Sequence, residues 1–312
     1  MPLFINRLLN NHILYIWNAF CSIKFCIFAS MYSAEMKGIS DYFKDKVIVI
    51  TGASSGIGLA AARLFASYGA RLSLAARSID KLRAISSELS DDPDRILCIR
   101  TDVSIESECR NLIESTVSRF GRIDILVNNA GLSMRATFRQ AELSVIKRLM
   151  DVNFWGTVCC TKFALPYLLA SKGSVVGVIS TAGYAGLPGR TGYAASKFAI
   201  RGFLETLRME HHDDELHVLV FAPGYTASNV RNAALLADGS PQGATPKDES
   251  KLMSAEEVAL KMAEGLYRHK REMILTMLGY WDVWLYKRVP RIMDWVQLRY
   301  IRKHEKSIDP EK

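Results

Sequence analysis

The chain has 312 residues and a formal net charge of +8, from 40 lysines and arginines against 32 aspartates and glutamates. That length allows one large α/β domain or two small ones. The positive charge first suggests nucleic acid, but no recognition motif for it is present and the basic residues concentrate at the two ends of the chain. We therefore expect no nucleic-acid partner.

The six cysteines have neither the spacing of metal ligands nor the density of a disulfide framework. We expect them to be small buried hydrophobic residues of a protein in a reducing, cytoplasmic compartment. His211 and His212 stand beside three acidic residues, but they fit a solvated helix end better than a metal site. The sequence therefore predicts no bound metal.

The first 35 residues contain an apolar stretch over 13–29 that is interrupted by Asn18 and Lys24. Its length is marginal for crossing a bilayer, which takes about 20 apolar residues. Three interpretations compete: a weak N-terminal anchor, a signal segment, or an extension upstream of a natural start at Met36. We treat residues 1–40 as an extension that precedes the folded domain.

A strand, a glycine-rich turn and a helix follow in order. Residues 46–51 are an apolar β-branched run, and Gly52-Ala-Ser-Ser-Gly56-Ile-Gly58 leads into an apolar-periodic helix. Glycines at such a turn permit positive φ and remove side chains, so backbone N–H groups and a helix N-terminus can approach a pyrophosphate. The turn therefore predicts a dinucleotide site, the alternative being a tight turn that binds nothing.

Further strand-like runs occur at 71–76, 95–100, 123–127, 174–180, 216–221 and 271–276. They alternate with helical patterns, and no polar linker separates them. Because crossover connections of this kind are right-handed, we predict one Rossmann-like α/β domain over residues 41–276. It has a doubly wound parallel sheet of about seven strands, with helices on both faces.

Tyr193 and Lys197 are four residues apart, and Ser180 ends an apolar run thirteen positions before the tyrosine. Side chains four apart lie on one face of a helix. An ammonium beside a phenol favours the phenolate and lowers a pKa that is ordinarily about 10. Tyr193 is therefore a candidate general acid or base, although Tyr and Lys at this spacing also occur by chance.

These motifs together resemble the short-chain dehydrogenase/reductase family in its compact single-domain branch. The glycine spacing of 52–58 is that of the family, and so is the order of the later motifs over about 46–276. Those motifs are Asn128-Asn129-Ala130-Gly131, Asp151-Val-Asn153, Ser180, Tyr193 with Lys197, and Pro223-Gly224 with Thr226. The resemblance implies an oxidoreductase that acts on CH–OH or C=O groups with a nicotinamide cofactor.

The resemblance also implies roles for individual residues. The catalytic set is Asn153, Ser180, Tyr193 and Lys197. The cofactor-binding set is Gly52, Ser54, Ser55, Gly56, Ile57, Gly58, Arg77, Asp102, Val103, Asn129, Ala130, Gly131, Tyr193, Lys197, Pro223, Gly224 and Thr226. Family members commonly pair through the helices that carry Asn153 and Tyr193, so a homodimer or homotetramer is expected.

The end of the second strand indicates which cofactor is bound. An acidic side chain there would accept hydrogen bonds from the ribose hydroxyls and repel a 2′-phosphate. The chain has Ala76 in that place, and Arg77 follows with a donor fork that suits a phosphate. This favours NADP(H) over NAD(H), unless Arg77 is only a solvated charge. A secreted enzyme would lack NADP(H), so the signal segment is the least favoured N-terminal interpretation.

Two segments near the C-terminus bear on the substrate. Residues 225–251 lie where the family has a mobile lid, and their polar and glycine content fits motion. Residues 277–312 mix tryptophan, tyrosine and basic side chains, which is typical of a membrane interface and also of a helical tail over the substrate cleft or a partner subunit. Both interpretations favour an apolar or lipid-like ketone, and either terminus is a candidate for membrane contact.

The sequence therefore predicts an NADP(H)-dependent enzyme that reduces such a ketone to a secondary alcohol. An NAD-dependent alcohol dehydrogenase of the same family is the first alternative. A nucleotide-binding scaffold without chemistry is the second, and it is disfavoured because the serine, tyrosine, lysine and asparagine are all present. An epimerase or dehydratase of the extended branch would have another glycine spacing.

Overall fold

A computed structural model describes residues 34–90, 92–224, 226, 233–243 and 252–304. The chain forms two units, Met1–Lys44 and Asp45–Lys312. In the first unit, residues 34–43 form a helix, and the apolar stretch 13–29 lies outside the described residues. All elements described below belong to the second unit. The predicted boundaries at residues 40 and 276 stay predictions.

The second unit contains a seven-stranded parallel sheet, as predicted. Its strands are β1 (Val47–Thr51), β2 (Arg71–Ala76), β3 (Ile96–Arg100), β4 (Ile125–Asn128), β5 (Ser174–Val178), β6 (His217–Ala222) and β7 (Glu272–Ile274). Their order across the sheet is β3-β2-β1-β4-β5-β6-β7, and each neighbouring pair is parallel. The strand order reverses between β1 and β4, so the sheet is doubly wound.

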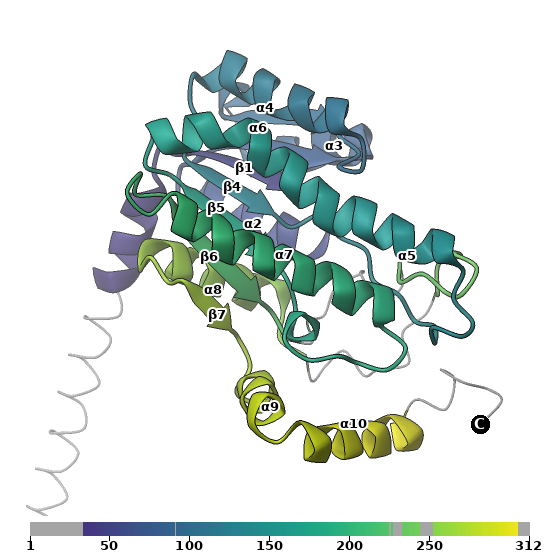
Figure 1. The fold of residues 1–312 in the computed structure, drawn as a ribbon. Coiled ribbons are helices and arrows are strands. Elements are labelled where there is room, and N and C mark those ends of the chain that lie inside the picture. The colour runs from purple at the N-terminus through teal and green to yellow at the C-terminus, as the bar shows by residue number, and fades with distance from the viewer. Residues whose placement is uncertain (1–33, 91, 225, 227–232, 244–251, 305–312) are drawn as a thin grey trace, which may run out of the picture. The chain divides into compact units, whose positions relative to one another are not determined.

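Helices cover both faces of the sheet (Figure 1). One face carries α2 (Gly56–Ser67), α3 (Ile79–Leu89) and α8 (Ala255–Tyr267), where α2 packs against α3 and α8. The other face carries α4 (Glu106–Phe120), α6 (Gly156–Ala170) and α7 (Thr191–Glu210), where α6 packs against α4 and α7. The short α5 (Leu143–Leu149) continues through a π-helical turn, Met150–Trp155, into α6.

The central strands are buried on both faces, which explains why their sequences are nearly continuous apolar runs. Every residue of β1, β5 and β6 is buried. Gly177 in β5 lets α7 come close, because a Cβ atom there would lie 2.1 Å from Cδ1 of Leu204. Apolar burial on this scale is the main stabilising contribution to such a fold.

The observed strands differ from the predicted ones mainly at their ends. Pro93–Arg95 form a 3₁₀ turn, so β3 begins one residue later than predicted. Ser180 ends the predicted fifth strand early, because it is the N-cap of a 3₁₀ turn over Thr181–Gly183. Thr276 leaves β7 because its Oγ1 accepts a hydrogen bond from the N–H of Gly279 at 3.0 Å and caps the next helix.

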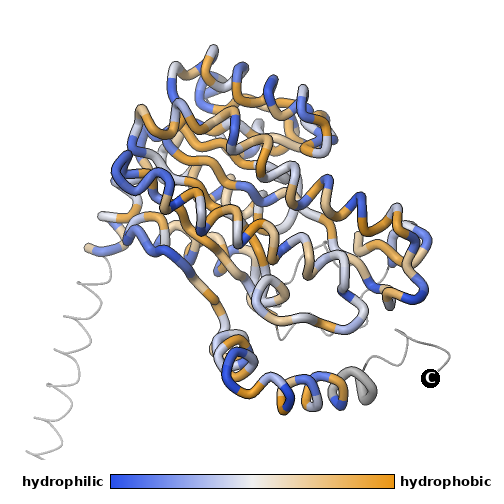
Figure 2. The backbone as a smooth tube through the Cα atoms, viewed as in Figure 1, coloured by the Kyte–Doolittle hydropathy of each residue, from blue (hydrophilic) through white to orange (hydrophobic). Residues whose placement is uncertain are grey.

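Two helices follow β7, α9 (Met277–Arg288) and α10 (Pro290–His304). Polar and apolar residues alternate along both of them (Figure 2). Within the described part of the chain, no helix combines the length and the hydrophobicity needed to cross a bilayer.

Candidate active site

A cavity of about 460 Å³ opens at the carboxyl ends of the strands. Its walls come from the segments that follow β1, β2, β3, β4, β5 and β6, and from the first two turns of α7. Ligands of doubly wound sheets bind at this edge, where the strand order reverses. The fold therefore brings together motifs that are spread over most of the domain.

The glycine turn forms one wall of this cavity. Gly52 and Gly56 have φ values of +67° and +54°, which other residues rarely adopt. Ser55 is the N-cap of α2, but its side chain makes no capping hydrogen bond. The first N–H groups of a helix need partners, and a phosphate is a suitable one. The turn therefore fits a pyrophosphate.

Gly58 is the one predicted residue of this turn that does not line the cavity. A Cβ atom there would lie 2.4 Å from the carbonyl oxygen of Gly52 and 2.5 Å from Nδ2 of Asn129. Gly58 thus allows α2 to pack against the turn, and it shapes the wall without facing the ligand space.

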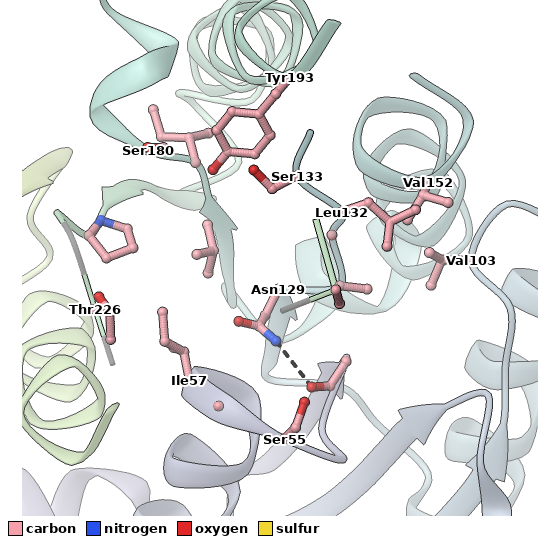
Figure 3. Close-up of a pocket in the computed structure, with 18 of the residues that line it drawn as sticks. Ser55, Ile57, Val103, Asn129, Leu132, Ser133, Val152, Ser180, Tyr193 and Thr226 are labelled. Carbon is pink, nitrogen blue, oxygen red and sulfur yellow. Dashed lines mark hydrogen bonds between the residues drawn. The ribbon is translucent and has the colours of Figure 1, made fainter. Parts of the chain in front are cut away.

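Asn129 ties the end of β4 to the end of β1 (Figure 3). Its Nδ2 donates to the carbonyl oxygens of Thr51, at 2.9 Å, and Gly52, at 3.3 Å. In return, Oγ1 of Thr51 accepts hydrogen bonds from the N–H groups of Asn129 and Ala130, each at 3.0 Å. These bonds hold the glycine turn at a fixed position relative to the Asn128–Gly131 segment.

The end of β2 forms a second, basic part of the cavity wall. Ala76 is buried, Arg77 is exposed, and both line the cavity together with Lys81 on the first turn of α3. Among the described residues, neither basic side chain forms a salt bridge. Two cations that form no salt bridge in the described part of the chain suit an anionic ligand.

Asp102 and Val103, which follow β3, also line the cavity. Burial raises the pKa of Asp102, but hydrogen bonds from Ser104 and the charges of Arg77 and Arg100 outweigh it, so the pKa lies below its usual value. Its Oδ1 accepts from Oγ of Ser104 at 2.6 Å and from the N–H of the same residue at 3.0 Å. The carboxylate is therefore ionised and held in place by the loop itself.

Ser180, Tyr193 and Lys197 all line the cavity, and Ser180 and Tyr193 lie on the side opposite Ser55 (Figure 3). Tyr193 and Lys197 lie on successive turns of α7, with Nζ of Lys197 5.8 Å from the centre of the Tyr193 ring. Ser180 follows β5, and its Oγ accepts a hydrogen bond from the N–H of Ala182 at 3.3 Å. The hydroxyl proton of Ser180 can therefore be donated into the cavity.

Lys197 is buried, with 5% of its surface exposed, and its Nζ donates to the carbonyl oxygen of Val178 at 2.8 Å. Burial lowers the pKa of Lys197 from 10.5 to about 8. The charged form therefore still predominates at neutral pH. With this pKa, the Lys197 amine can gain and lose a proton near neutral pH.

Asn153 is fully buried in the π-helical turn and does not line the cavity. Its side chain accepts from the N–H of Leu132 at 2.7 Å and donates to the carbonyl oxygen of Leu132 at 3.0 Å. It also donates to Oγ of Ser196 at 2.9 Å, which in turn donates to the carbonyl oxygen of Tyr193 at 2.8 Å. In this structure Asn153 links the loop after β4 to the first turns of α7.

Pro223, Gly224 and Thr226 line the cavity after β6. Gly224 lies against the cap of α9, because a Cβ atom there would be 2.7 Å from Cγ2 of Thr276. Of the predicted lid, residues 225, 227–232 and 244–251 lie outside the described residues. The described part approaches the loop after β4, where Leu235 forms a bridge with Met134.

The cavity is also lined by residues outside the predicted catalytic and cofactor-binding sets. They are Ala76, Ser78, Lys81, Thr101, Leu132, Ser133, Val152, Val178, Ile179, Thr181, Leu187, Arg190 and Ala233. For Lys81, the signal was its position four residues after Arg77, and for Arg190 its position three residues before Tyr193. Nothing local to Ser133 marks it as a cavity residue.

Residues 46–237 match the family model described as short chain dehydrogenase. A similar protein from Arabidopsis thaliana, 11-beta-hydroxysteroid dehydrogenase-like 4A, is 39% identical over 74% of this chain and 76% of its own length. Dehydrogenase/reductase SDR family member 7B of Rattus norvegicus is 33% identical over 85% of this chain and 84% of its own length.

Among solved structures, the chain resembles an alcohol dehydrogenase from the archaeon Thermococcus sibiricus, complexed with 5-hydroxy-NADP. That likeness has a TM-score of 0.65 at 27% identity and covers 74% of this chain and 96% of that one. A short chain dehydrogenase/reductase from Burkholderia phymatum, in complex with NAD, has a TM-score of 0.72 at 24% identity. It covers 80% of this chain and 95% of its own, and it supports the fold.

Proposed function

The chain belongs to the short-chain dehydrogenase/reductase family, and we propose that it uses NADP(H) to reduce a ketone to a secondary alcohol. As a member of that family it is an oxidoreductase acting on CH–OH or C=O groups with a nicotinamide cofactor. One observation carries the proposal: Ser180, Tyr193 and Lys197 line the same cavity as the glycine turn.

The preference for NADP(H) rests on the basic wall after β2. Arg77 and Lys81 line the cavity, and Ala76 stands where an acid would repel a 2′-phosphate. The glycine turn would hold the pyrophosphate, and Gly131 lies beside Lys197, because a Cβ atom at Gly131 would be 3.5 Å from Nζ of Lys197. The related archaeal alcohol dehydrogenase was solved with an NADP derivative.

The bound nicotinamide would supply the hydride for the carbonyl carbon. Ser180 donates a hydrogen bond to the carbonyl oxygen and orients it. Tyr193 transfers its phenolic proton to the same oxygen as negative charge develops there, so the alkoxide is never released. The carbonyl thereby gains one hydride and one proton and becomes a secondary alcohol.

The charge of Lys197, whose Nζ lies 5.8 Å from the centre of the Tyr193 ring, would stabilise negative charge that develops on the phenol oxygen. The Lys197 pKa of about 8 allows the amine to pass a proton toward the tyrosine and to recover one from solvent. The resemblance implies that Asn153 positions a water on that route. Its direct bonds to Leu132 and Ser196 support a role in positioning α7 as well.

The substrate we favour is apolar or lipid-like over most of its length. Leu132, Val152 and Leu187 line the cavity. The exposed residues Met277 and Leu278 begin α9, whose Gly279 packs against Thr181 of the cavity wall. The relatives named for 11-beta-hydroxysteroid dehydrogenation accord with a ketone of this kind.

A cofactor and ketone screen tests the proposed function. NADPH and NADH consumption is measured with ketones ranging from steroid-like compounds to long-chain acyl ketones. We expect turnover with NADPH on at least one apolar ketone and weaker activity with NADH. A preference for NADH would replace the proposal with an NAD-dependent alcohol dehydrogenase. Tight NADPH binding with no turnover in either direction would favour the scaffold alternative.

We also propose that the tail contacts membrane surfaces. Trp281 and Trp295 are 48% and 60% exposed, and Arg288 and Arg299 lie over Trp284 and Trp295 at 4.4 and 5.4 Å from the ring centres. Tryptophan with arginine is typical of membrane interfaces. The full chain should sediment with vesicles that contain anionic lipids, and Trp281→Ser/Trp295→Ser should reduce that fraction. Equal sedimentation of both proteins would contradict the proposal.

The oligomeric state that we propose is a homodimer or homotetramer. Trp155, the last residue of the π-helical turn, and Phe198, on α7, are 52% and 42% exposed. Large exposed apolar side chains on these two elements support pairing through them. Sedimentation equilibrium should give two or four times the chain mass of 34.9 kDa, and a monomer at micromolar concentration would contradict the proposal.

A further inference from the structure

A buried serine and an arginine form a pair beside the catalytic tyrosine. Ser133 follows the Asn128–Gly131 segment and is 4% exposed, and Arg190 is the N-cap of α7. Nη1 of Arg190 donates a hydrogen bond to Oγ of Ser133. Both residues line the cavity with Tyr193, and the Ser133 hydroxyl lies close to the Tyr193 phenol in the close-up (Figure 3).

The backbone around this pair is fixed from several directions. The carbonyl oxygen of Ser133 accepts from the N–H of Leu235 at 2.8 Å, and the N–H of Ala136 donates to the carbonyl oxygen of Gly189 at 3.1 Å. Met134 and Leu235 are buried in one small apolar cluster, against which the Tyr193 side chain packs. Ser133 and Arg190 therefore have fixed positions relative to the tyrosine.

Within the part of the chain that the structure describes, no carboxylate balances the charge of Arg190. Among the described residues, no aspartate or glutamate oxygen lies within 4 Å of its guanidinium, although the same helix pairs Arg201 with Glu205 at 2.8 Å. Arg190 is half-buried and lines the cavity. Removing a guanidinium from water without a partner is costly, so a ligand that brings an anionic oxygen would be stabilised there.

The position of Arg190 and Ser133 relative to Tyr193 indicates which groups a ligand should carry. Arg190 precedes Tyr193 by three residues, so the two side chains start within one helical turn, about 5 to 6 Å apart at Cβ. An anion on Arg190 and a carbonyl on Tyr193 can therefore belong to one small molecule, because both side chains line the same cavity. Leu132 and Leu187 are the neighbouring apolar lining residues, and they leave an apolar surface for the rest of that molecule.

We propose that Arg190 and Ser133 form a binding site for an oxyanion group of the substrate, which makes the enzyme selective for ketones that carry a carboxylate or a phosphate near the carbonyl. This inference rests on the proposed function, since it names the polar end of a substrate whose remainder is apolar. The guanidinium offers two parallel N–H groups to either anion, and the Ser133 hydroxyl adds a third donor.

The test compares 4-oxononanoate with its methyl ester, using the full chain and NADPH. We expect the unsubstituted enzyme to have a kcat/KM for the acid at least tenfold above that for the ester. In Arg190→Met that ratio should fall by about tenfold or more, because hydrogen bonds to charged groups contribute about 1.5 to 3 kcal/mol. Arg148→Met, which removes an exposed arginine of α5 outside the cavity, should leave the ratio within twofold.

Ser133→Ala provides a second variant that removes only one hydroxyl. The acid-to-ester ratio should fall about threefold or more in this protein. The inference is overturned if the unsubstituted enzyme prefers the ester, or if Arg190→Met keeps the original ratio. It is also overturned if Arg148→Met lowers the ratio as much as Arg190→Met does, because the effect would then be long-range charge.

A binding measurement separates this inference from the proposed reaction. Decanoate, decyl phosphate and decanamide are titrated into the NADPH-loaded enzyme by calorimetry, with no turnover required. At least one of the two anions should bind tenfold more tightly than the amide, and Arg190→Met should abolish the difference. Equal binding of all three probes would refute the oxyanion site even if ketones are reduced. Failure of every ketone in the screen, with anion binding intact, would refute only the proposed reaction.

Discussion

Polar side chains have different surroundings at the two edges of the sheet. At the amino edge, buried polar groups bond to one another and to the backbone. At the carboxyl edge, serine, tyrosine, lysine and arginine side chains surround a cavity of about 460 Å³. The same strands supply both edges, so the difference is one of side chains and loops.

The amino edge illustrates complete internal pairing. Asp124 is 5% exposed, and its carboxylate accepts from the N–H of Val47 at 2.9 Å and from Arg122 at 2.6 Å. His217 bonds through Nδ1 to Oγ of Ser174 at 3.0 Å and through Nε2 to the carbonyl oxygen of Lys270 at 2.9 Å. Since Nε2 faces a carbonyl, that nitrogen carries the proton and Nδ1 accepts from the serine. Such groups contribute to stability and leave little to offer a ligand.

We expect substitutions at the carboxyl edge to alter activity and substitutions at the amino edge to alter the stability of the fold. Changes to cavity side chains at the carboxyl edge remove contacts to ligands, so they should lower activity more than they lower the free energy of unfolding. Changes at the amino edge remove contacts present in the empty protein, so stability should fall while kcat stays constant. Three predictions test this division.

The largest effect is expected from Tyr193→Phe. Loss of the phenolic proton should lower kcat for ketone reduction by about a thousandfold, within the usual range for a general acid. The ring still packs against the apolar cluster around Leu235, so the NADPH dissociation constant and the urea midpoint should change little. Tyr167→Phe on α6, outside the cavity, is the matched control. Retention of most activity in Tyr193→Phe would show that another group donates the proton.

The next effect concerns acid stability. Burial, with smaller contributions from His269 and Arg208, lowers the pKa of His217 from 6.5 to about 4, although its bond to Lys270 opposes this. Between pH 6.5 and 4 the unfolded chain therefore binds a proton that the folded protein does not. The free energy of unfolding should fall by roughly 2 kcal/mol from pH 7 to 4.5 on this account.

Urea denaturation of His217→Gln checks this prediction, because glutamine does not titrate. The variant should lose roughly 2 kcal/mol less than the unsubstituted protein over the same pH interval. The exposed His212→Gln should keep the original pH dependence. If His217→Gln and the unsubstituted protein respond equally to acid, the amino edge does not control acid stability.

The smallest effect is expected from Arg77→Ala. Its exposed guanidinium is partly screened by water, and Lys81 stays in place. The ratio of kcat/KM with NADPH to that with NADH should therefore fall by about tenfold, with no change in the urea midpoint. Arg83→Ala, on the exposed side of α3, serves as the control. An unchanged ratio in Arg77→Ala would assign the cofactor preference to other residues.

Most of the fold could be predicted because its signals are local. Residues 47–50 and 218–222 are all apolar, which indicates strands buried on both faces. The errors fall where a short-range bond overrides the pattern. Ser180 and Thr276 both leave the predicted strands to cap the next helical turn.

The site was less predictable where its geometry depends on contacts between distant segments. Arg190 and Ser133 are 57 residues apart in the chain and form one hydrogen bond. Asn153 and Gly58 belong to motifs that indicate a binding site, yet neither lines the cavity. The Asn153 side chain is fully buried, and Gly58 packs closely against the glycine turn. Their roles depend on how closely α2 and α7 approach the strand ends.

The sequence by itself determined the order of the motifs, the parallel sheet and the helical stacking of Tyr193 with Lys197, because backbone periodicity and hydrophobic burial act over a few residues. Only the tertiary structure decided which side chains share the cavity. It placed Lys81 in the same cavity wall as Arg77 and brought Arg190 into hydrogen-bond contact with Ser133. The physical reason is that side-chain charges and hydrogen bonds act over a few ångströms in space, whatever their separation along the chain.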